Sequence, residues 1–242
     1  MPTVPSPQAA LDWETIDLVV FDVDGTLYDQ RRLRLAMLRQ LLRHAWRSRS
    51  LDVLLTLRTF RHVRESLGDE QADDFLQQQY SRTAALRGKT EGEVRDLTSD
   101  WMETRPLECI GACRYPHLQR VFSALRSQGK RVAVFSDYPA TAKLAALGLQ
   151  ADPVVCATDP QVARLKPDPA GLMAILRETG VPAHRTLMVG DRFDRDAAAA
   201  SAAGVRALIR SRSPHPEHPT FRGFDDAIFR QLLARTDAPV AA

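Results

Sequence analysis

Downstream of Pro106 the chain alternates between short apolar runs and helical stretches that end at a glycine. The apolar runs lack polar alternation, which predicts strands that are covered on both faces. The expected strands span 131–136, 153–157, 186–190 and 205–209, and the expected helices span 116–128, 139–147, 169–179, 194–203 and 225–235. Strands separated by helices pair in parallel, so this alternation predicts an α/β fold with a doubly wound parallel sheet.

Residues 17–22 (DLVVFD) predict one more buried strand near the start of the chain. From Arg31 to Asp100 the pattern changes, because glycine is sparse, proline is absent and apolar residues recur at helical spacing. We therefore expect a mostly α-helical cap domain, 30–112, inserted after the first strand. The expected α/β core consists of residues 1–29 and 113–242. Within it, residues 1–15 are expected to be a loose leader and 211–220 a loop.

Length and cysteine content indicate a globular protein that folds without disulfide bonds. A chain of 242 residues, 44% of them hydrophobic, can bury a core without disulfides or structural metals. Its three cysteines suit a reducing compartment. The first residues lack the pattern of a signal peptide, and no apolar run reaches the ~18 residues of a membrane span. The sequence therefore predicts a cytoplasmic protein.

Polar side chains stand where the predicted strands end. Asp22 and Asp24 follow the first strand, Ser136 ends the next, Lys166 stands in a later loop, and Asp191 follows the fourth. Because ligands bind at the carboxyl ends of strands in doubly wound sheets, we expect these groups to share one crevice. Clustered carboxylates repel one another unless a cation is present, and Mg²⁺ prefers oxygen ligands. The pattern therefore favours a magnesium site that receives a phosphoryl group.

Four short motifs resemble those of the haloacid dehalogenase (HAD) superfamily. DVDGT at 22–26 resembles the family's opening DxDGT, and Ser136 after its apolar strand is similar to the second motif. KPDP at 166–169 resembles the third motif, and GDRFDRD at 190–196, with Ala-Gly at 203–204, resembles the fourth. All four occur in the family's order, so the resemblance implies a Rossmann-like HAD core with an inserted cap.

The resemblance also implies a role for each position. Asp22 would be the nucleophile that forms an aspartyl-phosphate, and Asp24 the general acid and then the general base. Ser136 and Lys166 would bind the transferring phosphoryl group. Mg²⁺ would be held by Asp22, by Asp191 and by the backbone carbonyl of Asp24.

The fourth motif leaves two points open. Asp196 would be a supporting acid near the metal, with Asp194 as its competitor, and the spacing to the downstream Ala-Gly favours Asp196. Arg192 and Phe193 stand where small polar and aliphatic residues are usual in the family. Arg192 and Arg195 either neutralise neighbouring acids or contact the substrate.

Charge divides the expected cap into two halves. Residues 31–66 carry ten arginines and two acidic residues, whereas residues 67–112 carry five basic and ten acidic residues. The halves can pair with one another as antiparallel helices, which we favour. The basic half can instead turn to the crevice and attract an anionic substrate. Contact of this half with an anionic membrane is a further, less favoured alternative, and no specific nucleic-acid partner is expected.

These expectations predict a Mg²⁺-dependent phosphatase that hydrolyses a small phosphorylated metabolite through an aspartyl-phosphate. The alternatives are a phosphomutase, another HAD-type hydrolase, and a non-catalytic HAD-like binding protein that uses its basic cap. Asp24 argues against dehalogenation, because a halide leaves without a proton and family dehalogenases usually lack this second acid. The motifs leave the identity of the metabolite and the oligomeric state open.

Overall fold

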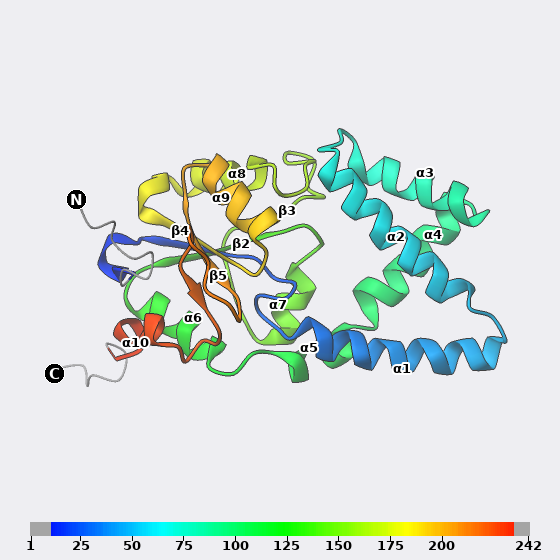
Figure 1. Ribbon diagram of the computed structural model, residues 1–242, viewed down its shortest axis with the longest axis horizontal. Helices are drawn as coiled ribbons and strands as arrows, with labels where there is room; N and C mark the ends of the chain where they lie inside the picture. Colours follow the sequence, from blue (N-terminus) through cyan, green and yellow to red (C-terminus); the bar gives the residue numbers. More distant parts are fainter. Residues whose placement is uncertain (1–10, 235–242) are drawn as a thin grey trace.

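A parallel sheet runs through the centre of the computed structural model, which describes residues 11–234 (Figure 1). Within these residues the sheet has six strands in the order β3-β2-β1-β4-β5-β6, and every pairing is parallel. The strands are β1 (Leu18–Phe21), β2 (Arg131–Ser136), β3 (Val154–Cys156), β4 (Thr186–Gly190), β5 (Arg206–Arg210) and β6 (Thr220–Phe221). This arrangement confirms the predicted α/β class.

Strand β1 shows why its apolar run lacks alternation. Its four residues are all buried, with Leu18 and Val20 in the apolar cluster on one face and Phe21 in the cluster on the other. In register, Phe21 lies level with Val134 of β2 and with Val189 of β4. The carboxyl ends of three central strands therefore meet at one edge of the sheet.

Helices cover both faces of the sheet (Figure 1). One apolar cluster holds side chains of α6 (Leu118–Ser127), α7 (Thr141–Leu147) and α10 (Ala227–Ala234). The other cluster holds side chains of α8 (Ala170–Thr179) and α9 (Ala198–Ala202). The helix predicted over 194–203 begins as a π-helical turn at Phe193–Ala197 and continues as α9.

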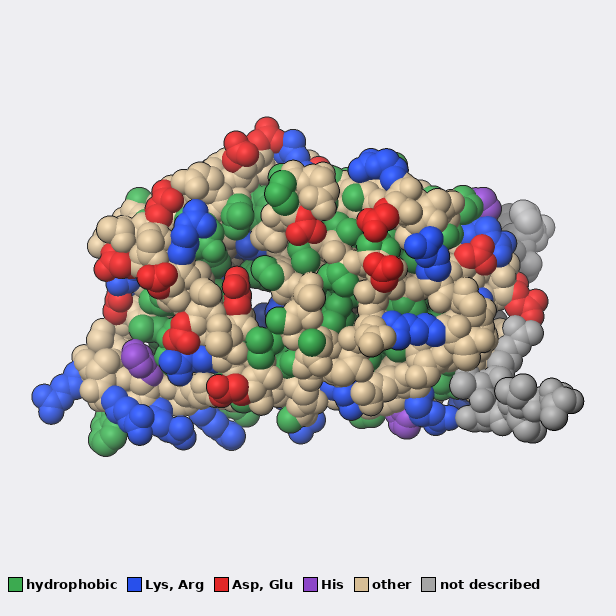
Figure 2. Space-filling model, turned by 180° about the vertical axis from the view of Figure 1, so that it is seen from behind, with side chains coloured by type: hydrophobic (Ala, Val, Ile, Leu, Met, Phe, Trp, Pro, Cys, Tyr) green, Lys and Arg blue, Asp and Glu red, His purple; other side chains and the backbone are tan. Residues whose placement is uncertain are grey.

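The insertion between β1 and β2 is helical, as expected, and extends from one end of the core (Figure 1). It contains α1 (Gln30–Ser48), α2 (Asp52–Asp69), α3 (Phe75–Arg87), α4 (Glu91–Thr98), a π-helical turn at Ser99–Thr104, and α5 (Leu107–Cys113). Seen from behind, Lys and Arg side chains gather along the edge of the molecule over α1 (Figure 2, lower left).

The chain enters and leaves this insertion at adjacent positions. Tyr28 and Arg114 form an antiparallel bridge. The Asp29 N–H donates to the Cys113 carbonyl over 2.8 Å, and the Tyr115 N–H donates to the Leu27 carbonyl over 3.2 Å. The Asp29 side chain also accepts hydrogen bonds from the first turn of α1 and so fixes where that helix begins.

Of the two irregular segments expected from the sequence, the loop is confirmed, and the leader is wrong in the part that the structure describes. Of the predicted loose leader, residues 1–10 lie outside the described residues, but Trp13 is 1% exposed. The Trp13 indole N–H donates to the Ile228 carbonyl over 2.7 Å, and its ring packs against Phe229. The loop predicted at 211–220 is confirmed over 211–219, and its last residue, Thr220, begins β6, a strand too short to show any periodicity.

The chain was expected to lack a transmembrane segment. None of the helices in residues 11–234 combines the length and the hydropathy that a bilayer span requires.

Candidate active site

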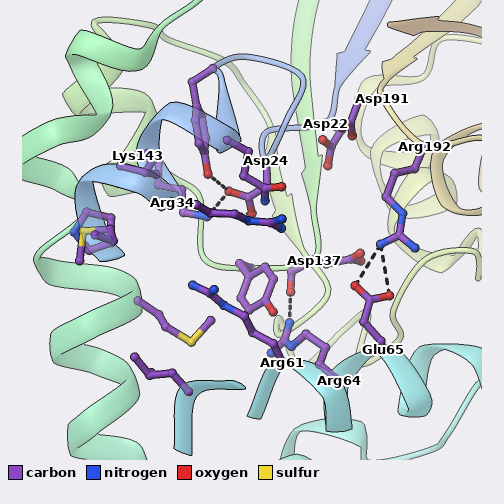
Figure 3. A pocket seen from close by; sticks show the side chains of 18 of the residues that line it. Asp22, Asp24, Arg34, Arg61, Arg64, Glu65, Asp137, Lys143, Asp191 and Arg192 are labelled. Carbon is purple, nitrogen blue, oxygen red and sulfur yellow. Dashed lines mark hydrogen bonds and ion pairs between the residues drawn. The ribbon is translucent and has the colours of Figure 1, made fainter. Parts of the chain in front are cut away.

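A cavity of about 630 Å³ lies between the core and the inserted helices (Figure 3). Asp22, Asp24, Lys166 and Asp191 line it from the carboxyl ends of the strands and the loops that follow them. Helices α1 and α2 and the turn at 99–104 line it from the other side. The cavity is therefore at the edge where doubly wound sheets bind ligands.

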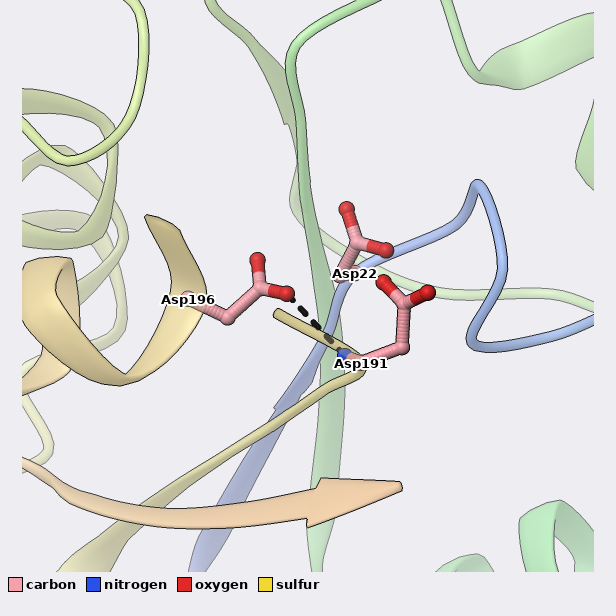
Figure 4. Close-up of side chains that lie close together, drawn as sticks. All are labelled: Asp22, Asp191 and Asp196. Atoms are coloured by element: carbon pink, nitrogen blue, oxygen red, sulfur yellow. Dashed lines mark hydrogen bonds between the residues drawn. The ribbon is translucent and has the colours of Figure 1, made fainter. Parts of the chain in front are cut away.

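Three carboxylates meet in this cavity. One oxygen from each of Asp22, Asp191 and Asp196 lies within 4.8 Å of the others (Figure 4). Burial, reinforced by the neighbouring carboxylates, raises the pKa of Asp22 well above its ordinary value. Burial and the charge of Asp196 likewise raise the pKa of Asp191 to about 7. The group therefore concentrates negative charge in a place that water solvates poorly.

Lys166 is the cation within this group. Its Nζ donates to Asp22 Oδ1 over 2.6 Å and to Asp196 Oδ1 over 2.7 Å, and the side chain is 2% exposed. Burial would lower the pKa of Lys166, but the two carboxylates outweigh it and raise the pKa well above its ordinary value. One ammonium offsets only part of the charge of three carboxylates. The oxygen ligands that remain fit a hard divalent ion such as Mg²⁺.

Two motif glycines allow the carboxylates to come this close. Gly25 has a φ of +97°, and a Cβ there would lie 2.2 Å from Asp191 Oδ2. A Cβ on Gly190 would lie 2.4 Å from the Asp196 side chain. A larger residue at either position would push a carboxylate out of the group.

The structure places the two competing acids of the fourth motif differently. Asp196 is 1% exposed, and its Oδ2 accepts hydrogen bonds from the backbone N–H groups of Asp191 and Arg192, each over 3.0 Å. Asp194 has a side chain that is 64% exposed and pairs with Arg192 over 2.7 Å. Asp196 therefore belongs to the carboxylate group and Asp194 does not.

Asp24 makes a separate set of contacts. The Lys143 ammonium donates to its two carboxylate oxygens over 2.6 and 2.8 Å, and the Tyr28 hydroxyl donates to it as well (Figure 3). Burial would raise the pKa of Asp24, but Lys143 and Tyr28 outweigh it and lower the pKa. The Asp24 side chain is thereby held apart from the other three carboxylates.

Ser136 stands at the expected strand end, but its side chain is fully buried and is not among the described residues that line the cavity. Its Oγ accepts a hydrogen bond from the Tyr138 N–H over 3.3 Å. Of the sequence-predicted site residues, the cavity thus brings together the four aspartates and Lys166 but not Ser136.

Arginines on both sides of the cavity differ in their pairing. Arg192 pairs with Glu65 of α2 over 3.0 Å, and Arg195 pairs with Asp69 of α2 while donating to the Lys166 carbonyl. These two arginines therefore join the core to α2. Arg34 of α1 and Arg61 of α2 also line the cavity, yet neither has an ion-pair or hydrogen-bond partner for its guanidinium among the described residues (Figure 3).

The cap was expected to pair its basic half with its acidic half. The described ion pairs of the insertion do not include any arginine from residues 31–66. Helix α2 of the basic half does pack against α3 and α4 of the acidic half, through an apolar cluster that includes Phe60, Ala84 and Val94. The halves therefore pair as helices, but among the described residues their arginines do not make the ion pairs that the opposite charges suggested. The basic residues instead face the cavity at Arg34, Arg61 and Arg64, or face solvent.

Sequence reasoning missed Lys143 and Arg64. The chain has only four lysines, and Lys143, seven residues after Ser136, is the one polar residue of the stretch 142–147 (AKLAAL). The scarcity of lysine, together with this apolar surrounding, could have marked Lys143 as a candidate site residue. Arg64 is buried, with Nε donating to Gln79 Oε1 over 3.0 Å and a second nitrogen donating to the Asp137 carbonyl. Nothing in the sequence distinguishes Arg64 from the nine other arginines of its half.

Comparisons with known proteins identify the family and the fold. A family model described as haloacid dehalogenase-like hydrolase matches residues 16–204. A phosphoglycolate phosphatase from Rhodospirillum rubrum is 39% identical over 129 residues, which are 50% of this chain and 53% of that protein. The match thus spans about half the length of that relative.

Solved structures share the fold. A 2-haloacid dehalogenase from Pseudomonas syringae aligns with a TM-score of 0.62 at 23% identity, over 91% of this chain and 99% of that one. The Bacillus subtilis protein YfnB bound to magnesium aligns with a TM-score of 0.64 at 14% identity, over 90% and 98%. CbbY from Rhodobacter sphaeroides, in complex with phosphate, aligns with a TM-score of 0.55 at 19% identity, over 86% and 95%.

Proposed function

The chain belongs to the haloacid dehalogenase-like hydrolase family, and from this premise we propose that it hydrolyses small phosphate monoesters with Mg²⁺ as its cofactor. The observation that carries the proposal is the group of Asp22, Asp191 and Asp196 around Lys166 at the wall of a cavity. The phosphatase from Rhodospirillum rubrum supports the same class of reaction.

The donor set fits the proposed metal. Asp22 and Asp191 offer carboxylate oxygens, with Asp196 beside them as the proposed supporting acid. The backbone carbonyl of Asp24 would be a further ligand. Mg²⁺ bound there would neutralise the charge of the phosphoryl group and of the carboxylates, which lets an anionic substrate enter. The magnesium-bound relative YfnB supports this choice of ion.

The residues of this chain would then perform two steps. An Asp22 oxygen attacks phosphorus, the ester P–O bond breaks, and Asp24 donates a proton to the leaving alkoxide. Asp24 then takes a proton from a water molecule that attacks the aspartyl-phosphate, which releases phosphate and restores Asp22. Lys166 balances charge on the phosphoryl oxygens, and Ser136 is the proposed second donor to them.

Asp24 suits this exchange of roles. Lys143 favours its ionised form in the free protein, which is the form that accepts a proton from water. A phosphate dianion beside it favours the protonated form, because like charges repel. In the same proposal residues 30–112 act as the cap, which limits water and selects the substrate.

Dehalogenation is the rival chemistry within the family. A halide needs no proton when it leaves, whereas Asp24 is buried and held by Lys143 and Tyr28. Because Lys143 and Tyr28 both position the Asp24 carboxyl, the site favours a reaction in which a proton is transferred.

The test is a hydrolysis screen across phosphorylated metabolites, phosphoglycolate included, with Mg²⁺ and a phosphate-release readout. Asp22→Asn is the blank, because it keeps the shape of the side chain and removes the nucleophile. We expect turnover in the native protein that excess EDTA abolishes and Mg²⁺ restores. Equal turnover by the blank, or full turnover in EDTA, would contradict the proposal.

A further inference from the structure

Helix α1 carries a second apolar face that nothing in the described chain covers. Its inner face buries Leu33 and Met37. Beside this face four large apolar residues recur at intervals of three and four, which places them in one stripe along the helix. They are Leu35, Leu38, Leu42 and Trp46, with exposed fractions of 51, 39, 52 and 81%.

Just beyond α1, Leu51 immediately before α2 and Leu55 in its first turn are 54 and 41% exposed, and we count them with the stripe. Within residues 11–234 the large apolar residues that are exposed number eight, and these six are among them. The remaining two, Leu86 and Met173, are on other helices. The exposed apolar surface of the described chain is therefore concentrated at one place, which is typical of a docking surface.

Arginines flank the stripe. Helix α1 has six of them and no acidic residue. Each apolar residue of the stripe has an arginine three or four positions away, as in the pairs Leu35 with Arg39 and Trp46 with Arg43. The arginines of α1 form no ion pair with any described residue, so their charge is available to a partner.

A second copy of the chain fits this surface poorly. A symmetric contact would lay α1 against α1 and bring two rows of unpaired arginines together. An asymmetric contact would need a complementary apolar patch elsewhere, and the described residues outside the stripe offer only the isolated Leu86 and Met173. The partner must therefore offer an apolar surface to the stripe and, next to it, negative charge to the arginines.

An anionic lipid bilayer has both properties, since its acyl region lies directly below a layer of phosphate groups. We propose that α1 lies flat on an anionic membrane, with the stripe in the acyl boundary and its arginines other than Arg34, which lines the cavity, on the lipid phosphates. Six arginines within 19 residues prevent the helix from crossing the bilayer. Because Leu38 also lines the cavity, docking would set the α1 side of the candidate active site against the membrane.

Tryptophan emission and vesicle sedimentation test the proposal together. The probes are vesicles of phosphatidylcholine with phosphatidylglycerol, and vesicles of phosphatidylcholine alone. Of the three tryptophans, Trp13 and Trp101 are 1 and 5% exposed, so a blue shift on binding reports Trp46. We expect sedimentation and a blue shift with the anionic vesicles only, and both should weaken as salt rises.

Two variants and a matched control separate the apolar from the charged contribution. Leu42→Ser with Trp46→Ser should weaken binding at least about tenfold, because partitioning scales with buried apolar area. Arg39→Gln with Arg43→Gln should weaken it and flatten the salt dependence. Leu86→Ser alters an exposed leucine of α3 and should bind as the native protein does.

Three results would overturn the proposal. The first is a native protein that stays in the supernatant with anionic vesicles. The second is equal binding by the native protein and the Leu42→Ser, Trp46→Ser variant. The third is a native dimer in light scattering that this variant abolishes, since a second copy would then cover the stripe.

Discussion

Lys143 and Tyr28 set Asp24 apart from the other carboxylates of the cavity. Asp24 can therefore be altered without removing a member of the group formed by Asp22, Asp191 and Asp196. This separation makes the two proposed steps distinguishable by experiment.

The first prediction concerns Asp24→Ala. Phosphoryl transfer from p-nitrophenyl phosphate hardly needs a proton donor, because nitrophenolate is a good leaving group, whereas the second step needs a base. This variant should release about one equivalent of nitrophenol and then stall, losing the 10²–10⁴-fold contribution that a positioned acid/base typically makes. An alkyl phosphate should give no burst. Rapid-quench kinetics with intact mass measure both, and undiminished steady turnover would show that Asp24 is not the acid/base.

A second prediction compares two arginines of α1. Arg34 lines the cavity without a partner, whereas Arg39 is exposed and does not line it. A cation in the cavity raises the association of anionic substrates, and that effect is screened over about 8 Å at physiological salt. Arg34→Gln should lower kcat/KM by about tenfold, equal to about 1.4 kcal/mol, and flatten its salt dependence. Arg39→Gln should leave both unchanged, and equal effects of the two variants would count against a role for Arg34.

Sequence patterns anticipated part of this site for a physical reason. Asp22 and Asp191 immediately follow strands, so the parallel sheet alone brings them to one edge. Lys143 lies on a helix, and its contact with Asp24 depends on how α7 packs against the sheet. This contact depends on how distant parts of the chain pack together, and the spacing of residues within a motif does not show that.

At the scale of elements, α2 joins the insertion to the core by polar contacts and by a small apolar cluster that includes Leu67, Phe75 and Leu165. Arg64 is central to this contact, because it links Gln79 of α3 to the carbonyl that follows β2. The Arg64 guanidinium also lies 4.0 Å from the centre of the Tyr138 ring.

The third prediction compares Arg64 with its neighbour Arg61. Arg64→Leu leaves a buried Gln79 oxygen without its donor, which should lower the free energy of unfolding by about 1–3 kcal/mol. Arg61→Leu removes an exposed side chain without a partner, so the change should stay within about 0.5 kcal/mol. Urea denaturation monitored by circular dichroism measures both. A similar loss in the two variants would show that the Arg64 contacts add nothing.

The elements that sequence patterns missed are those without periodicity. β6 is two residues long, and Trp13 packs into the core from a 3₁₀ turn of three residues. Neither is long enough to show a helical or strand period. The strands with four or more apolar residues were predicted because burial on both faces leaves a continuous apolar run.

At the scale of the whole molecule, the carboxylate group and the proposed Mg²⁺ together predict how the stability of the protein responds to metal. Asp22, Asp191 and Asp196 repel one another in the folded state, and unfolding separates them. An ion that binds only the folded protein therefore raises its stability by mass action.

The fourth prediction follows from this repulsion. Mg²⁺ at 100 times its dissociation constant should raise the free energy of unfolding by about 2.7 kcal/mol. Asp191→Asn should be more stable than the native protein without metal, since one repelling charge is gone, and should lose the response to Mg²⁺. Asp194→Asn, outside the group, should keep it. Calorimetry with and without Mg²⁺ measures the stability of each variant. An equal response of the two variants to Mg²⁺ would show that the ion binds elsewhere.

The two ends of the insertion run side by side, bridged at Tyr28 and Arg114 and hydrogen-bonded between Asp29 and Cys113. The strands on either side of the insertion, β1 and β2, pair directly with one another, so the sheet is continuous without the inserted helices. The insertion is therefore attached to the core through one short junction, so changes in the length or charge of its helices need not change the order of the strands.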